Sequence, residues 1–247
     1  MIYFILIALI FYNIMQFVET VSFGSRLAGK LANRLSLGTT LQNSFYVSSR
    51  LFLLPFLIIL SYLIESGLDI EFFLIISAIF VGTAFITSLL VLVKFNFFQI
   101  FFQNIFELYD AFGSVPNAIL RLIFRRRVNK SKKINIESSP KITTLSFKKI
   151  ITSAFAYFFL STGYLISFSF AILIPEYRMT LNQLAAVFHG IGTMVLAMYI
   201  DPMISNSLDE ALDGDRWLEN IYSIFIGRLL AYLIGFGVFL SLYLFVS

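Results

Sequence analysis

The stretch "NSFYVSSRLFLLPFLIIL", residues 43–60, decides the fold class. After Arg50 its side chains are apolar at nearly every position, which predicts a buried helix rather than the alternating strand of a membrane barrel. Fourteen residues separate Arg50 from the next charge, Glu65. That is about 21 Å of helix, less than the ~30 Å hydrocarbon core of a bilayer. A spanning helix must therefore begin near residue 44 and carry Arg50 below the membrane surface.

The composition of the whole chain indicates an integral membrane protein. Hydrophobic residues make up 59% of the 247 residues and charged residues 13%, whereas soluble domains average about 45–50% and 25%. The chain has no cysteine, which excludes disulfides and thiolate metal sites. We predict an all-α integral membrane protein forming a single polytopic domain, 1–247. Its six transmembrane helices are expected at about 2–21, 44–64, 72–93, 150–174, 181–201 and 222–246.

The basic residues predict the orientation. Segment 94–149 contains eleven lysines or arginines, whereas segment 65–71 contains none. Basic loops stay in the cytoplasm, so 94–149 and the basic segment 22–43 are predicted inside. Six spans then place both termini outside. The first residues lack the basic start of a signal peptide, so we expect an uncleaved first span.

Segment 94–149 is expected to separate two three-helix halves. Its pattern predicts an amphipathic helix over 94–112, a second helix over 116–127 and a mobile linker over 128–146. The amphipathic helix places its polar residues on a face of their own, namely Gln99, Gln103, Glu107 and Asp110. Two placements stay open: residence on the inner leaflet, with 94–133 binding anionic lipid, or packing on neighbouring helices.

Two arginines near the cytoplasmic starts of spans have two interpretations. Arg50 either lines a hydrated cavity or snorkels to the cytoplasmic surface. Arg228 repeats the pattern in the sixth span. The preceding spans end in the acids Glu19 and Asp201, so Glu19–Arg50 and Asp201–Arg228 are either neutralising ion pairs or parts of a substrate site. A further hypothesis is that both arginines bind one anionic headgroup.

His189 is the only histidine, about eight residues into the fifth span. It is either a neutral imidazole hydrogen-bonded between helices or a proton or ligand site. The sequence has no paired histidines at metal spacing, no G-x-S-x-G and no P-loop. We therefore assign no catalytic residue and expect no cofactor, no resident metal and no nucleic-acid partner.

Several short blocks, taken in order, resemble the Amj family. They are Glu19-Thr20 followed by "SRLAGK" at 25–30, "SSR" at 48–50, "HGIGT" at 189–193 with "YIDP" at 199–202, and Gly227-Arg228. That family consists of bacterial polytopic proteins proposed as alternate flippases for lipid II, the undecaprenyl-diphosphate-linked cell-wall precursor. The resemblance implies five candidate substrate-binding positions, which are Glu19, Arg26, Arg50, Asp201 and Arg228.

The resemblance also implies a function and a location. The protein is expected to translocate a polyprenyl-diphosphate-linked saccharide across the bacterial cytoplasmic membrane and not to be an enzyme. Two alternatives are kept. One is a membrane-embedded enzyme acting on a lipid headgroup, with His189 as base and Asp201 as an orienting or metal-binding group. The other is a non-catalytic scaffold that recruits a partner through 94–149.

Overall fold

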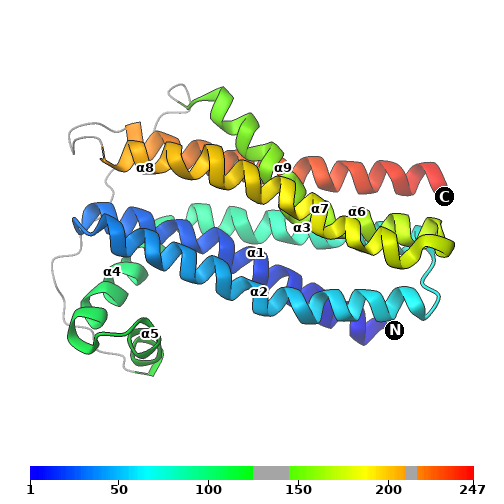
Figure 1. The fold of residues 1–247 in the computed structure, drawn as a ribbon, viewed down its shortest axis with the longest axis horizontal. Coiled ribbons are helices and arrows are strands. Elements are labelled where there is room, and N and C mark those ends of the chain that lie inside the picture. The colour runs from blue at the N-terminus through cyan, green and yellow to red at the C-terminus, as the bar shows by residue number, and fades with distance from the viewer. Residues whose placement is uncertain (125–144, 210–215) are drawn as a thin grey trace.

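The computed structural model describes residues 1–124, 145–209 and 216–247, and every regular element in these ranges is helical (Figure 1). Six helical stretches are long and apolar enough to cross a membrane, which confirms the predicted fold class. The elements are α1 (Ile2–Leu31), α2 (Leu35–Glu65), α3 (Ile70–Val93), α4 (Phe95–Phe112), α5 (Val115–Phe124), α6 (Phe147–Leu173), η2 (Pro175–Tyr177), α7 (Arg178–Val195), η3 (Leu196–Ile200), α8 (Asp201–Asp209) and α9 (Arg216–Val246).

The first two spans continue well beyond their predicted ends. The expected loop over 22–43 is wrong, because α1 and α2 form one long hairpin with a short turn over 32–34. Ser25 is a polar residue satisfied within the hairpin, because its hydroxyl donates to the Gly38 carbonyl at 2.9 Å. A Cβ on Gly29 would lie 2.9 Å from the Gly38 Cα, so the two helices touch through glycine backbone. This close approach lets a polar sequence stay helical.

The inner half of α1 is the centre of the bundle. Residues 19–30 are all buried, because α1 packs against α2, α3 and α4. The other group of helices is built on α6, which packs against α7 and α9, and contact between α3 and α9 joins the groups. On α1, one apolar cluster includes Ala8 and Met15 and the other includes Val21 and Ala28. A polar layer that contains Glu19 separates the two clusters.

The amphipathic helix is present as α4, but part of its predicted polar face is buried. Gln99 and Gln103 are 0% and 9% exposed, and α4 lies against α1. The Phe102 ring covers Gly24 of α1, where an added Cβ would lie 3.3 Å from the ring. Packing on neighbouring helices is therefore the placement observed for α4, because the polar inner half of α1 provides a surface that amides can cover. Gly113, with φ of 69°, ends the helix.

The next predicted features of this segment are described only in part. The second predicted helix is present as α5, which ends at Phe124. The expected residues 125–127 of this helix, and the predicted linker up to residue 144, lie outside the described residues.

The fifth span contains a change of helical pitch. After α7, the π turn η3 leads into α8, and the Asp201 amide donates to the Leu196 carbonyl five residues earlier. Pro202 follows at once and cannot donate to the Met198 carbonyl, which accounts for irregular hydrogen bonding here. The π turn sets the direction in which the side chain of Asp201 points from the helix axis.

The predicted topology has a direct labelling test. Both termini lie at one end of the bundle, and α4 and α5 lie at the other (Figure 1). Because the chain has no cysteine, single cysteines report one position each. In intact cells we expect an impermeant maleimide to label Asp69→Cys and to leave Lys148→Cys unlabelled until the membrane is permeabilised. The opposite labelling pattern would reverse the assigned orientation.

The crossing of α6 and α9 predicts a strong effect of one methyl group. A Cβ on Gly227 would lie 2.5 Å from the Ile150 carbonyl oxygen and 2.6 Å from the Ser153 Cβ. We expect Gly227→Ala to lower the free energy of unfolding by roughly 1–3 kcal/mol through overpacking. Gly237→Ala on the same helix is the matched control, since its Cβ meets nothing within 4 Å. Thermal unfolding in detergent measures both; equal stability of the two variants would contradict the crossing.

Candidate functional site

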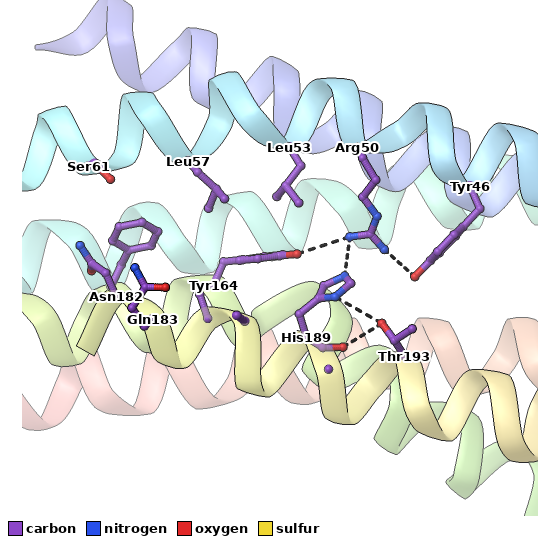
Figure 2. A pocket seen from close by; sticks show the side chains of 14 residues that line it. Tyr46, Arg50, Leu53, Leu57, Ser61, Tyr164, Asn182, Gln183, His189 and Thr193 are labelled. Carbon is purple, nitrogen blue, oxygen red and sulfur yellow. Dashed lines mark hydrogen bonds between the residues drawn. The ribbon is translucent and has the colours of Figure 1, made fainter. Parts of the chain in front are cut away.

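A groove of about 830 Å³ lies between α2 and α7, and α6 also contributes to its lining (Figure 2). The α2 residues that line it run from Tyr46 to Ser61, which is about 22 Å of helix at ~1.5 Å per residue. Much of the wall is apolar, through Leu53, Leu57 and Phe168. The groove is thus a long, largely apolar space inside the membrane-spanning part of the bundle.

Arg50 projects into this groove and is held by three aromatic or imidazole side chains (Figure 2). Its Nη1 lies 2.5 Å from Nε2 of His189 and donates to the Tyr164 hydroxyl at 3.4 Å. Its Nη2 donates to the Tyr46 hydroxyl at 2.6 Å, and the guanidinium also stacks over the Tyr46 ring, 4.7 Å from its centroid. The structure places Arg50 on the lining of the groove, and its role as a functional cation stays a prediction.

The other end of the groove carries neutral hydrogen-bonding groups. Asn182 and Gln183 come from the first turns of α7, and Ser61 faces them from α2 (Figure 2). Gln183 is exposed and the other two are partly exposed. The groove therefore combines one cation with amides and a hydroxyl placed farther along the same walls.

Arg228 lies elsewhere, in a buried network between α9 and α1. It is 1% exposed, and its Nη2 donates to Glu19 Oε2 at 3.2 Å and to Gln16 Oε1 at 2.9 Å. Its Nε donates to the Tyr232 hydroxyl at 2.8 Å, and its guanidinium lies over the Tyr157 ring. Glu19 therefore pairs with Arg228, and the expected pair Glu19–Arg50 is wrong. The physical reason is that the hairpin turns α2 so that Ser49, not Arg50, meets Glu19, and its hydroxyl donates to Oε1 at 3.1 Å.

The second expected pair, Asp201–Arg228, is also wrong. Asp201 pairs with Arg26 of α1, at 2.8 Å between Nη2 and Oδ1. Arg26 is 2% exposed because the helix that contains it continues to Leu31. From the sequence, residues 22–31 are expected to form a loop. Their helical extension of α1 supplies Arg26 as the partner of Asp201.

The structure gathers the predicted residues into three places. Arg50 and His189 meet in the groove, Glu19 and Arg228 form the buried network, and Arg26 and Asp201 form a third pair. Arg50 and Arg228 do lie at a similar level, because Ser49 and Arg228 both contact Glu19. They do not face one cavity, however, since Arg228 does not line the groove. The shared-headgroup hypothesis stays a prediction, and the burial of Arg228 weighs against it.

The enzyme alternative required Asp201 to act with His189. In the structure Asp201 contacts Arg26, and the imidazole of His189 is positioned by Arg50 and Thr193 instead. Among the residues with described positions, no three His, Asp or Glu side chains gather as metal ligands. The expected orienting or metal-binding role of Asp201 beside His189 has no geometric basis here.

Sequence reasoning missed the neighbours of the arginines. Tyr46 lies four residues before Arg50, and Tyr232 four residues after Arg228, so helical spacing could have found both. Tyr164 is 114 positions from its partner Arg50, and no local pattern reveals such a contact.

Comparison with known proteins agrees with this architecture. Searches of curated proteins and of solved structures find no match. The family described as "Amj: Alternate to MurJ" matches residues 11–247, nearly the whole chain. Its name implies a flippase, hence a transporter rather than a catalyst, in the bacterial cytoplasmic membrane. With six membrane-spanning helices and a match over nearly its whole length, this chain belongs to the Amj family.

Proposed function

We propose that this protein translocates a polyprenyl-diphosphate-linked saccharide of the lipid II kind across the cytoplasmic membrane, with the headgroup passing along the α2–α7 groove. Arg50 is the counter-charge of the diphosphate. The neutral polar groups of Asn182, Gln183 and Ser61 are the partners of the saccharide. The polyprenyl chain stays in the surrounding lipid.

One observation carries this proposal: Arg50 has no carboxylate partner among the described residues. Arg26 and Arg228 each have one, at 2.8 and 3.2 Å, whereas Arg50 has only hydroxyls and an imidazole. A charged side chain inside the membrane costs several kcal/mol unless it is paired. A guanidinium matches the oxygens of a diphosphate in a planar fork. Arg50, the cation that faces the groove, is therefore the arginine that can form an ion pair with an anionic ligand.

The two helices that flank the groove carry exposed apolar side chains, which suits an amphiphile. Leu54 and Ile58 of α2 are 61% and 69% exposed, and Val187 of α7 is 55% exposed. Such side chains face lipid in a membrane protein, so a prenyl chain can remain outside while the headgroup lies within. The membrane potential, negative inside, favours outward movement of an anion by about 2.3 kcal/mol per charge per 100 mV.

We also propose that α5 lies at the inner leaflet and contacts anionic lipid. Leu120 and Phe124 are 51% and 83% exposed, and Arg121 is exposed beside them. Apolar and basic side chains together are typical of a helix at the membrane interface.

Filling the groove tests the proposed path. A Cβ on Gly190 meets nothing within 4 Å, so the backbone accepts a side chain there, and Gly190→Phe adds a ring at the groove. In liposomes carrying a fluorescent polyprenyl-diphosphate saccharide, we expect wild type to move the lipid between leaflets and Gly190→Phe to lose most of that rate. Gly237→Phe on α9 is the matched control and should keep the rate. A Gly190→Phe protein that is folded and fully active would refute the α2–α7 path.

A further inference from the structure

The protonation state of His189 follows from its contacts. A guanidinium nitrogen can only donate, so His189 Nε2, 2.5 Å from Arg50 Nη1, must accept with its lone pair. The imidazole is therefore neutral and carries its proton on Nδ1. That proton faces Thr193 Oγ1 at 3.3 Å, and the Thr193 hydroxyl itself donates to the His189 carbonyl at 2.9 Å. Each donor in this chain of contacts has an acceptor.

A phosphate oxygen that accepts from Arg50 Nη1 competes with His189 Nε2 for the same N–H donor. The lone pair of Nε2 points to the place where a phosphate oxygen would accept from Arg50, and two acceptors repel each other. A proton on Nε2 removes the conflict, because the imidazolium then donates to the anion while Nδ1–H keeps its bond to Thr193. Before binding, a second cation beside Arg50 is unfavourable; after binding, the anion stabilises it.

No protein group next to His189 favours protonation of its imidazole, among the described residues. Arg50 and Tyr46 line the groove from α2. Tyr164 faces His189 from α6, and the centroids of the Tyr164 and His189 rings are 5.3 Å apart. In the described parts of the chain, no carboxylate hydrogen-bonds the imidazole. Glu19 of α1 accepts from Ser49 of α2 and pairs with Arg228 of α9. The anion itself is thus the group that can favour the charged imidazole.

We propose that His189 is a proton-binding site coupled to the anion site at Arg50, so that binding of a diphosphate headgroup is accompanied by uptake of one proton on His189. This inference rests on the proposed anion site in the groove. The protonated imidazole then gives the anion a second hydrogen-bond donor beside Arg50. The affinity of the protein for the anion rises as the pH falls through the range in which histidine titrates, about pH 8 to 5.

The lone histidine makes the test direct. The full chain contains one histidine, so histidine-selective ¹⁵N and ¹³C labelling, with a purification tag free of histidine, gives the NMR signals of His189 alone. At pH 7.5 we expect a neutral imidazole protonated on Nδ1 in the empty protein. Saturation with farnesyl diphosphate should convert it to the doubly protonated form, whereas farnesol, which lacks the charge, should leave it neutral.

Calorimetry provides the matched measurement. Titration of farnesyl diphosphate in buffers with different ionisation enthalpies counts the protons taken up on binding. His189→Gln, which stays neutral, should bind with about one proton fewer than wild type. The ligand's own ionisation contributes equally to both proteins and cancels in the difference.

The outcomes separate this inference from the function it rests on. Absence of saturable binding, or binding unchanged in Arg50→Leu, overturns the proposed anion site itself. Binding that needs Arg50 while the imidazole stays neutral, in either tautomer, overturns the proton coupling alone. Binding that needs Arg50, with a charged imidazole and the missing proton in His189→Gln, supports both.

Discussion

Replacing Arg50 by leucine is expected to reduce translocation of a fluorescent polyprenyl-diphosphate saccharide by roughly 100-fold in proteoliposomes, while the protein folds and inserts at least as well as wild type. The loss follows because each charge-assisted hydrogen bond to the diphosphate contributes about 1.5–3 kcal/mol. The fold is expected to persist because removing a cation that has no carboxylate partner among the described residues leaves no opposite charge unpaired.

Arg50→Lys is the matched variant for this prediction. It keeps the charge and loses the planar fork, so we expect an intermediate rate. Size-exclusion profile and thermal unfolding show whether either protein is misfolded. A leucine variant with full activity would mean that Arg50 only snorkels to the surface.

Arg228 is expected to give the opposite result, a loss of stability. Arg228→Met leaves Glu19 buried at 4% exposure without its cationic partner. Removing one member of a buried ion pair costs about 3–5 kcal/mol. We therefore expect a large drop in the thermal unfolding temperature and in the yield of folded protein.

A double variant tests whether the loss of stability comes from the unpaired charge of Glu19. Glu19→Gln with Arg228→Met removes both charges, and it should be more stable than Arg228→Met alone. Binding of farnesyl diphosphate to the double variant should remain, because Arg50 still lines the groove. If the folded double variant loses binding as completely as Arg50→Leu does, Arg228 belongs to the anion site and the shared-headgroup hypothesis is correct.

The number and type of the spans could be predicted from the sequence because they depend on local properties. A run of apolar residues long enough to cross hydrocarbon must be helical to satisfy its own backbone, wherever it packs. The residues "NSFYVSSRLFLLPFLIIL", 43–60, therefore predicted both the span and an arginine inside it. The same logic identified His189 as a polar side chain in a span. The pattern of Phe and Gln residues predicted α4 from helical periodicity alone.

Helix ends and ion pairs could not be predicted in this way. The inner end of α1 is rich in polar residues, and it is helical only because α2 and α4 cover it and Gly29 meets Gly38. Once α1 is extended, Arg26 comes within reach of Asp201, and Glu19 is left to Arg228.

The sequence by itself determined a six-span helical membrane protein with arginines, acids and one histidine within or at the ends of its spans, since hydropathy and helical periodicity act over neighbouring residues. Only the tertiary structure decided which arginine faces an open groove and which are neutralised inside the bundle. Tyr164 and His189 reach Arg50 from helices more than a hundred positions away. The rotation of α2 about its axis, set by glycine packing in the hairpin, directs Ser49 to Glu19 and Arg50 to the groove.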